Sequence, residues 1–247
     1  GLKNYWHGLY NRLTRGFLLS NSNGFVAVTN ELKDDKCFSS YSIPTVVIAN
    51  GFSCSEVDYY SMNFCQSQRQ QLIFVGSSKM PWHGLDKIYE MAKLIPDFDF
   101  HIVGPEISEV EKIGVNLNNL IVYGHLAERE ILDLFKKCDV GVSTLALHRI
   151  GMNEACPLKS RQYLSYGLPI IIGYKDTDFL NPQEFVLNIG NFENNVSDSI
   201  EKIKSFVLNA RSLDKESIFD YAKSNLDYLH KEGLRLNFFE KTLESVR

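Results

Sequence analysis

The sequence predicts an α/β protein built on a doubly wound parallel sheet. Short apolar runs alternate along the chain with segments whose apolar residues recur at helical spacing, a pattern typical of a parallel sheet covered by helices on both faces. Glycine stands at or next to the ends of the runs near residues 72, 98, 120 and 167–173, where backbone turns sharply or approaches a ligand. Ligands of such sheets bind outside the carboxyl ends of the strands, so we expect the functional site there.

The first part of the chain is expected to hold two helices and two strands. The pattern indicates a helix over residues 5–19, a buried strand over residues 24–28, a short helix that opens at Asn30 and Glu31, and a strand over residues 45–48 that ends in Asn50-Gly51. Residues 53–71 are polar with little periodicity. We interpret them as a linker or an excursion.

The sheet itself is expected from residue 72 onward. The predicted strands cover residues 72–75, 98–103, 120–123, 140–142, 170–172 and 185–189. The predicted helices between them carry apolar residues over 85–95, over 131–138 and in the segment that follows residue 157. From residue 196 to the end the pattern is helical, with an interruption expected at Gly233.

Composition limits the classes of function. With 247 residues and 44% hydrophobic residues, the chain can bury a full core and hold one large or two small domains. A net charge of −4 and a pI near 5.9 lack the basic patch that a nucleic-acid partner would need. Five cysteines without C-x-x-C or zinc-like spacing indicate a reducing cytoplasm. No apolar run reaches the roughly 18 residues of a membrane span, so we expect a cytoplasmic protein, with the inner face of the membrane as an alternative.

The stretch from Gly151 to Ile172 is the most informative in the chain. Glu154 precedes a Pro-Leu-Lys turn, and a predicted helix then runs to a Gly-Leu-Pro stop and an apolar strand. In such a unit the free N–H groups at the start of the helix, with Lys159 beside them, face the crevice at the sheet edge. A phosphate would be stabilised at that position.

This stretch resembles the signature of the glycosyltransferase group 1 family, retaining enzymes of the two-domain GT-B fold. In that family a glutamate is followed eight positions later by a second one, just ahead of Gly-x-Pro; here Glu154 fills the first place and Gln162 the second. The resemblance implies that Glu154 touches the donor sugar and that Gln162 binds the ribose hydroxyls. Because an amide offers one acceptor where a carboxylate offers two, the exchange is expected to weaken ribose binding about tenfold.

The resemblance also implies further donor-binding positions, with departures from the family pattern. The family places an arginine beside a first glycine and a lysine before a second one, and both neutralise the diphosphate. Here Gly76 is followed by Ser77 and Lys79, and His83 precedes Gly84. A similar Trp-His-Gly stretch occurs in a subset of these transferases associated with surface-polysaccharide assembly. The remaining expected donor-binding positions are Gly104, His125, Leu126 and Leu158, with His125 and Leu126 in the turn that holds the base.

Domain limits follow from the same comparison. Residues 1–50 resemble the tail of the N-terminal acceptor domain and the hinge, and residues 51–247 resemble the nucleotide-sugar-binding Rossmann-like domain with its C-terminal helices. About 150 residues of acceptor domain are therefore expected to be absent. Two further residues, His148 and Arg149, precede the signature loop. They either reach the sugar or the phosphate, or face solvent.

The resemblance implies a hexosyltransferase-type enzyme that moves a sugar from a nucleotide diphosphate sugar to a hydroxyl acceptor with retention, in surface polysaccharide or glycoconjugate synthesis. Glu154 and Lys159 are the expected catalytic residues. No cofactor or metal ion is expected, and the acceptor would be a glycan or a lipid-linked molecule, with membrane association through the absent domain left open. The alternatives are a sugar-nucleotide epimerase, a non-catalytic nucleotide-binding module or a degenerate transferase. A nicotinamide-dependent oxidoreductase is disfavoured because no G-x-G-x-x-G run occurs.

Overall fold

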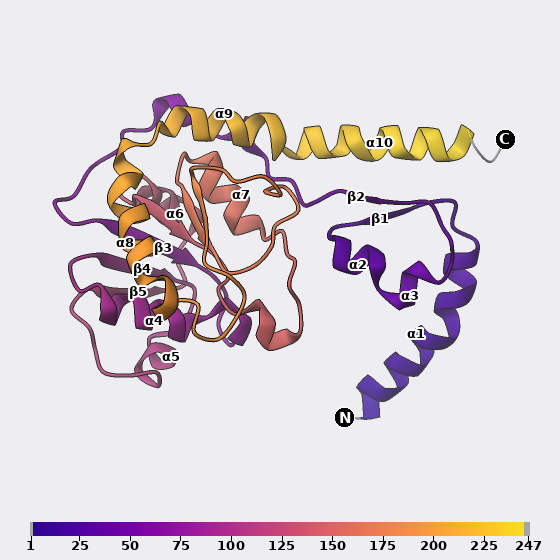
Figure 1. Ribbon diagram of the computed structural model, residues 1–247, viewed down its shortest axis with the longest axis horizontal. Coiled ribbons are helices and arrows are strands. Elements are labelled where there is room, and N and C mark those ends of the chain that lie inside the picture. The colour runs from indigo at the N-terminus through magenta and orange to yellow at the C-terminus, as the bar shows by residue number, and fades with distance from the viewer. Residues whose placement is uncertain (1, 245–247) are drawn as a thin grey trace.

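The protein consists of a six-stranded sheet enclosed by helices and a smaller unit built on two strands (Figure 1). The structure, a computed structural model, describes residues 2–244; within the first helix the side chains of residues 2–5, 7, 11 and 12 lie outside that description. The α/β class with a doubly wound parallel sheet, predicted from the sequence, is confirmed.

All six strands of the large sheet are parallel. The chain starts in the centre, moves outward through two strands and then returns past its starting strand, so that the sheet order is β5-β4-β3-β6-β7-β8. The order therefore reverses between β3 and β6, and ligands of doubly wound sheets bind at such a point. The strands are β3 (Gln71–Val75), β4 (Asp99–Val103), β5 (Leu120–Gly124), β6 (Val140–Val142), β7 (Ile170–Ile172) and β8 (Val186–Asn188).

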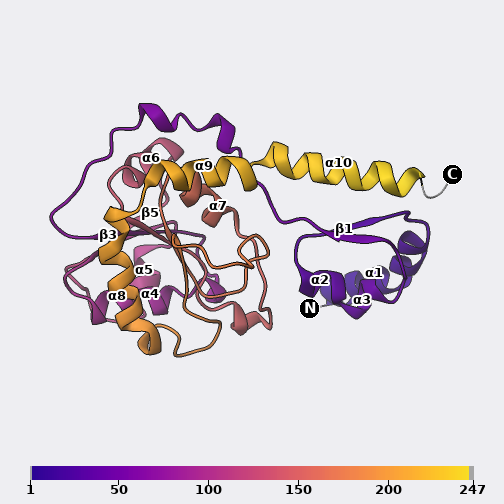
Figure 2. The same cartoon turned by 45° about the horizontal axis from the view of Figure 1, so that its top comes forward.

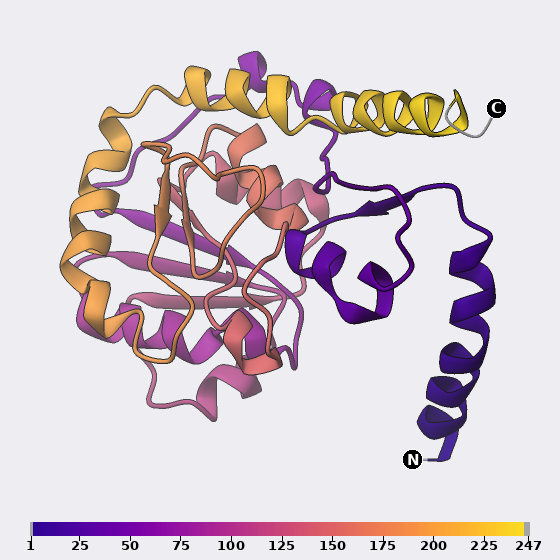
Figure 3. The ribbon, with the colours of Figure 1, turned by 45° about the vertical axis from the view of Figure 1, so that its right-hand side comes forward.

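Helices cover both faces of this sheet, because successive side chains of a strand point to opposite sides. Leu72 and Phe74 of β3 join one buried apolar cluster, which also contains side chains of α4 (Leu85–Leu94) and α8 (Ile200–Asn209). Ile73, between them, joins the other cluster. That second cluster contains side chains of α6 (Glu128–Phe135), α7 (Leu158–Ser165) and α9 (Lys215–Asn225). Figures 2 and 3 show the strands between these two helical layers.

Two of the expected glycines, at the carboxyl ends of β3 and β4, have no room for a side chain. Gly104 has φ of +102°, and a Cβ there would lie 1.6 Å from the carbonyl oxygen of Gly76. Gly76 itself has the ring of Phe74 at 2.4 Å from the position of a Cβ. The two strand ends therefore come together only because Gly104 has no side chain, and the lack of one on Gly76 leaves room for the rings of Phe74 and His83.

Replacing Gly104 by alanine is expected to lower the free energy of unfolding by about 2–4 kcal/mol, because the new methyl group adds backbone strain and steric overlap. Urea denaturation measures the loss. Gly233→Ala is the matched control, since Gly233 lies on the exposed side of a helix with nothing within 4 Å of a Cβ, and it is expected to raise stability by up to about 1 kcal/mol. Equal effects of the two substitutions would contradict the packing described for Gly104.

The smaller unit follows the order predicted for the first fifty residues. Its helices and strands are α1 (Leu2–Ser20), β1 (Phe25–Ala27), α2 (Asn30–Asp34), α3 (Lys36–Ser39) and β2 (Thr45–Val47). The two strands pair in parallel. Helix α3 was not predicted; it forms because the carboxylate of Asp35 accepts a hydrogen bond from the N–H of Cys37. Helix α5 (Ile107–Glu111), in the larger unit, was not predicted either.

Of the two interpretations of residues 53–71, a linker or an excursion, the linker is wrong for the first half, which packs against the larger unit. Residues 54–56 and 59–61 form 3₁₀ turns, and Cys54 and Tyr59 are buried. The ring of Tyr59 stacks on Phe219 of α9 with centroids 4.6 Å apart. These two contacts could not be predicted from the sequence, because Cys54 and Tyr59 stand among polar residues and packing on a distant helix requires no periodic spacing.

The last helix, α10 (Tyr228–Glu244), passes through Gly233, so the interruption expected there is wrong. Backbone hydrogen bonds of a helix do not need a side chain, and a single glycine costs only about 1 kcal/mol. Figure 1 shows α10 extending from α9 over the smaller unit. There Phe238 and Thr242 lie against Gly24. Of the helices between residues 2 and 244, none combines the length and the apolar content of a membrane span.

Candidate functional site

Two buried nitrogen atoms without hydrogen-bond partners lie where β3 ends and α7 begins. Lys159 stands in the first turn of α7 and its Nζ lies 4.3 Å from the centre of the Phe74 ring. The ring of His83 lies 5.6 Å from the same phenyl ring. Lys159 Nζ and His83 Nδ1 are both buried, and neither has a hydrogen-bond partner among the described residues. Buried polar atoms are rarely left unsatisfied, which makes this pair unusual.

Burial determines the charge of both groups. It lowers the pKa of Lys159 to about 7. Burial, followed by the charge of nearby Lys159, lowers the pKa of His83 to about 4, and these effects outweigh a hydrogen bond to the backbone of Ser77 that raises it. Lys159 is therefore close to half protonated at neutral pH and His83 is neutral. No carboxylate in the described part of the chain forms an ion pair with Lys159. The site is positive or neutral, and it is suited to an anion.

The turn between β3 and α4 positions His83. Residues Pro81–His83 form a 3₁₀ turn that ends at Gly84 with φ of +75°. The turn folds back on the sheet, since a Cβ on Gly76 would lie 2.9 Å from His83 Nδ1. Ser77 is exposed at its outer side. The sequence-predicted residues Gly76, His83 and Gly84 are thus brought together at the end of β3.

Lys79 lies away from this pair. Its side chain is exposed, and its backbone, with φ of 60°, donates to the carboxylate of Glu109 over 2.9 Å. The left-handed backbone directs the chain around the turn and ties it to α5. Of the two lysines expected near the phosphate, Lys159 has its amino group buried over the ring of Phe74, whereas Lys79 lies at the surface.

Tyr163 and a group of hydroxyls position α7 against the sheet. Tyr163 Oη accepts from the N–H of Val75 over 2.7 Å and donates to the carbonyl of Val142 over 3.3 Å, so it joins β3 to β6. Its ring lies on Gly141, where a Cβ would be 2.4 Å away. The hydroxyls of Ser143, Ser160 and Tyr174 bond to one another over 2.8–3.1 Å. The first turn of α7 is therefore held firmly at the switch point.

The positions expected for the base and the ribose line the neighbouring strand ends. Gly104 donates its N–H to the carbonyl of Gly124 over 2.7 Å, which joins the ends of β4 and β5. His125, directly after β5, is exposed, while Leu126 packs against the buried cluster on the α6 side. On α7, Leu158 is 55% exposed and Gln162 is partly buried.

Glu154 has an unexpected partner. Its Oε2 accepts from the N–H groups of Asn30 (2.7 Å) and Glu31 (3.1 Å) at the start of α2. Its Oε1 takes no hydrogen bond from the described residues. Glu154 also lines a cavity of about 680 Å³, together with Tyr174, Asn188 and other polar residues. One carboxylate oxygen of Glu154, the predicted catalytic residue, is thus bonded to the smaller unit, and the residue also lines the cavity.

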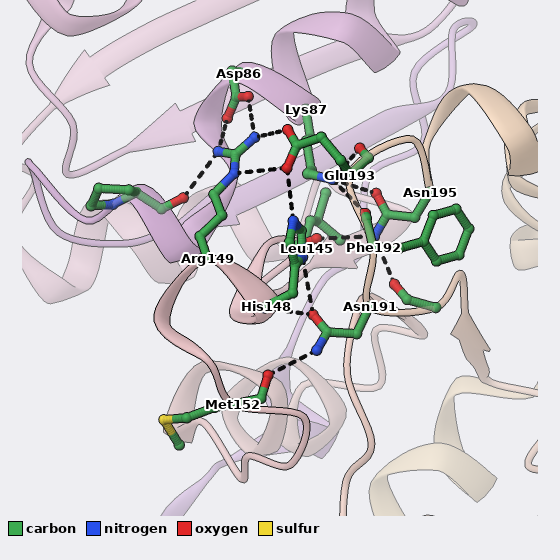
Figure 4. Close-up of polar contacts among 12 residues, drawn as sticks. Asp86, Lys87, Leu145, His148, Arg149, Met152, Asn191, Phe192, Glu193 and Asn195 are labelled. Carbon is green, nitrogen blue, oxygen red and sulfur yellow. Dashed lines mark hydrogen bonds and ion pairs between the residues drawn. The ribbon is translucent and has the colours of Figure 1, made fainter.

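His148 and Arg149 belong to a network of ion pairs (Figure 4). Arg149 bonds both carboxylate oxygens of Asp86, over 2.8 and 2.6 Å, and also pairs with Glu193. His148 Nε2 lies 2.7 Å from Glu193. Hydrogen bonds from Arg149 and then His148 lower the pKa of Glu193 to about 2. Both residues bind protein groups and do not simply face solvent, and the network ties α4 to the loop after β8.

The same network supports the loop that carries Glu154. The N–H of His148 donates to Oδ1 of Asn191 over 2.8 Å, and Nδ2 of Asn191 donates to the carbonyl of Met152 over 2.8 Å (Figure 4). Sequence reasoning missed Asn191 as a site residue. Its only signal was its place just after the glycine that ends the last strand.

Arg161 forms a second network that the sequence argument missed. Its side chain is fully buried and binds Asp176 and Asp178, and its Nε donates to the carbonyl of Asn50 over 3.3 Å. Lys231 of α10 pairs with Asp178 over 2.5 Å. The Asp-x-Asp spacing of residues 176–178, which often serves a metal clamp, is thus used for ion pairs. The described residues contain no group of three or more metal-binding side chains.

No protein-family model and no curated protein sequence matches this chain. Solved structures do match. Sucrose-phosphate synthase from Thermosynechococcus elongatus has a TM-score of 0.67 at 14% identity, over 95% of this chain and 62% of the synthase. A glycosyltransferase from Rickettsia africae has a TM-score of 0.67 at 16% identity, over 95% of this chain and 67% of its own.

A third similar structure is the lipopolysaccharide outer core galactosyltransferase WaaB, with a TM-score of 0.63 at 14% identity, over 92% of this chain and 63% of WaaB. The chain therefore spans about two thirds of the length of these proteins. At such identities the matches establish the fold: the chain has the α/β fold of GT-B glycosyltransferases, with its parallel six-stranded sheet.

Proposed function

We propose that this protein is a glycosyltransferase of the group 1 family, which moves a hexose from a nucleotide diphosphate sugar to a hydroxyl acceptor with retention. The observation that carries the proposal is the pair of buried, partnerless nitrogens, Lys159 Nζ and His83 Nδ1, at the switch point of the sheet. An anion with several oxygens would satisfy both, together with the free N–H groups at the start of α7. A diphosphate has that chemistry.

The residues around this pair have distinct roles in the proposed reaction. Negative charge develops on the departing diphosphate, and Lys159 would stabilise it in a site from which water is largely excluded. Neutral His83 would donate from Nδ1 when that nitrogen carries the proton. Glu154 would accept from the sugar hydroxyls through Oε1, which is free of other hydrogen bonds. The other proposed donor-binding residues are Gly76, Ser77, Lys79, Gly84, Gly104, His125, Leu126, Leu158 and Gln162.

The domain division supports the same proposal. Residues 1–50 would belong to the acceptor domain and hinge, and residues 51–247 would bind the donor. What supports this division is that β1 and β2 form a sheet of their own, separate from the six-stranded one. The acceptor would be a glycan or a lipid-linked molecule in surface polysaccharide or glycoconjugate synthesis, with the reaction at the cytoplasmic side.

A non-catalytic nucleotide-binding module is the second candidate, and Gln162 is the observation that favours it. The amide has no hydrogen bond to another described side chain, so it is free to bind a ribose, but with a single acceptor oxygen. A panel of nucleotide sugars tested for thermal stabilisation would show ligand binding in either case. Release of nucleotide diphosphate with transfer to an acceptor would separate an active enzyme from a binding module.

UDP-sugars are the first members of that panel. Three similar structures were solved with UDP bound: TarM of S. aureus, the pneumococcal O-GlcNAc transferase and HepE of Anabaena. We expect the binding of one UDP-sugar to raise the melting temperature by several degrees at saturating concentration. Isomerisation of the free UDP-sugar without any acceptor would instead indicate an epimerase.

Replacing Glu154 by alanine is expected to weaken the binding of the nucleotide sugar by about 2–3 kcal/mol, the usual cost of a lost hydrogen bond to a charged group. The affinity for free UDP should change little, because Lys159 and His83 are unaltered. Titration calorimetry measures both. Glu130→Ala is the control, since Glu130 caps α6 at the surface. Unchanged affinity for every nucleotide sugar that binds the parent protein would show that Glu154 has no such role.

A further inference from the structure

Glu31 and Glu154 exchange hydrogen bonds across segments 122 to 124 residues apart in the sequence. Oε2 of Glu154 accepts from the backbone N–H groups of Asn30 and Glu31. In return, Oε2 of Glu31 accepts from the N–H groups of Asn153 and Glu154, each over 2.8 Å. Oε1 of Glu31 accepts from the side-chain amide of Asn153, also over 2.8 Å. We refer to these five bonds as the carboxylate clasp.

The clasp satisfies groups that would otherwise lack partners. The first N–H groups of a helix have no acceptor within it. At the start of α2, the side chain of Thr29 accepts from the N–H of Leu32. The carboxylate of Glu154 accepts from the N–H groups of Asn30 and Glu31. Burial opposes the charge of Glu31, but the hydrogen bonds from Glu154 and Asn153 outweigh it and lower the pKa of that carboxyl. Each of the two carboxylates is held by N–H donors of the other segment.

The clasp determines how Glu154 faces the neighbouring cavity. Glu31, Asn153 and Glu154 line the same cavity of about 680 Å³. Because both bonds to Glu154 use Oε2, the carboxylate is fixed with Oε1 free. Asn153 is also held from the other side, since its Oδ1 accepts from Asn191 over 3.1 Å. The loop that carries Glu154 is thus held between the smaller unit and the end of β8.

Further contacts through Cys156 join the smaller unit to this loop. Cys156 lies within hydrogen-bond distance of the carbonyl of Val28, and the amide of Asn50 donates to the carbonyl of Cys156 over 3.1 Å. Lys159 and His83 take no part in any of these bonds. A change in the clasp should therefore affect Glu154 without changing the nitrogens that would bind the diphosphate.

We propose that Glu31 is a positioning residue for Glu154, and that it sets the affinity for the sugar part of the donor without contributing to the diphosphate part. The inference depends on the proposed function. Through Glu31, the smaller unit would control whether the loop holds Glu154 ready to accept from the sugar. Loss of the Glu31 carboxylate would remove bonds to two backbone N–H groups of that loop, and Glu154 would lose its fixed orientation.

The test compares two ligands, UDP and the UDP-sugar that gives the largest thermal shift. Glu31→Gln keeps the size of the side chain but presents a donor group where the loop offers donors. It is expected to weaken UDP-sugar binding about tenfold and to leave the dissociation constant of UDP within about twofold. Glu31→Asp keeps the charge with a shorter reach and should lie between the two. Asp35→Asn is the matched control, because Asp35 caps α3 in the same unit without touching the loop.

A double-mutant cycle separates positioning from general loosening. In the Glu154→Gln background, Glu31→Gln should weaken UDP-sugar binding no further. The inference is overturned if Glu31→Gln weakens UDP and UDP-sugar equally, if it has no effect while Glu154→Gln weakens the sugar alone, or if the two substitutions add fully. If Glu154→Gln changes the affinity for neither ligand, the role of Glu154 in the proposed function fails, and the inference fails with it.

Discussion

Replacing Lys159 by methionine is expected to make the free protein more stable and to prevent it from binding a nucleotide diphosphate. Both effects follow from an ammonium group that is buried against Phe74 without an acceptor. Methionine has a similar length, carries no charge and packs well on an aromatic ring. A stabilising substitution that removes binding is typical of a site whose charge serves a ligand and not the fold.

The gain in free energy of unfolding expected for Lys159→Met depends on pH. Burial lowers the pKa of Lys159 to about 7 in the folded protein, against about 10.4 in the unfolded chain. Between these values the unfolded chain binds a proton that the folded protein lacks, so the stability of the parent protein rises with pH. Below about pH 7 Lys159 is protonated in both the folded and the unfolded protein, and its buried charge then lowers the stability of the folded protein by the full amount. Lys159→Met should therefore gain about 2–4 kcal/mol in free energy of unfolding at pH 7, and little near pH 10.

Whereas Lys159→Met should increase stability, it should weaken the binding of a nucleotide diphosphate. A bound diphosphate would favour the ammonium form and raise the pKa of Lys159, so binding at pH 8 should take up close to one proton. Affinity in the parent protein should then fall about tenfold per pH unit above pH 7. Loss of the charged hydrogen bond should weaken UDP binding by at least about thirtyfold in Lys159→Met.

Urea denaturation at several pH values and titration calorimetry in buffers of different ionisation enthalpy measure these quantities. For the stability measurement, Lys79→Met is the matched control, because the Lys79 side chain is exposed in the turn after β3 and it is the backbone N–H that bonds Glu109. It should leave stability within about 0.5 kcal/mol. Unchanged or lower stability of Lys159→Met at pH 7, or binding without proton uptake, would refute the proposal that the charge of Lys159 serves an anionic ligand.

Replacing Arg161 by methionine is expected to cause the largest loss of stability among single substitutions outside the sheet. The guanidinium is fully buried and binds the carboxylates of Asp176 and Asp178. Removing one partner of a buried ion pair leaves charge without compensation and costs about 3–5 kcal/mol. Lys231 still pairs with Asp178 in the variant, so Asp176 would carry most of the uncompensated charge.

The midpoint of urea denaturation measures this loss. Lys136→Met is the matched control, since Lys136 forms an exposed pair with Asp133 within one helical turn, and such pairs contribute less than about 0.5 kcal/mol. Adding Asp176→Asn to the Arg161 variant should recover part of the stability, because it removes the unpaired charge. A loss below about 1 kcal/mol for Arg161→Met would contradict the burial of this network.

The sequence by itself determined the class of the fold and the positions where the strands end. Apolar runs and helical spacing are local properties, so they predicted the six strands from residue 72 onward and the helices between them. The glycines at strand ends could also be predicted, because close backbone approach leaves no room for a Cβ. The resemblance around Glu154 selected the crevice, and the GT-B fold agrees with it.

Only the tertiary structure decided what each polar side chain of that crevice touches. Spacing could not show that Lys159 is buried without a partner while Lys79 is exposed, since both are lysines beside turns. Nor could it show that Glu154 is held by α2 or that Arg161 binds two aspartates. The clasp joins segments more than 120 residues apart. The burial and the charge state of a side chain depend on such distant neighbours, and the local periodicity of a sequence does not reveal which neighbours these are.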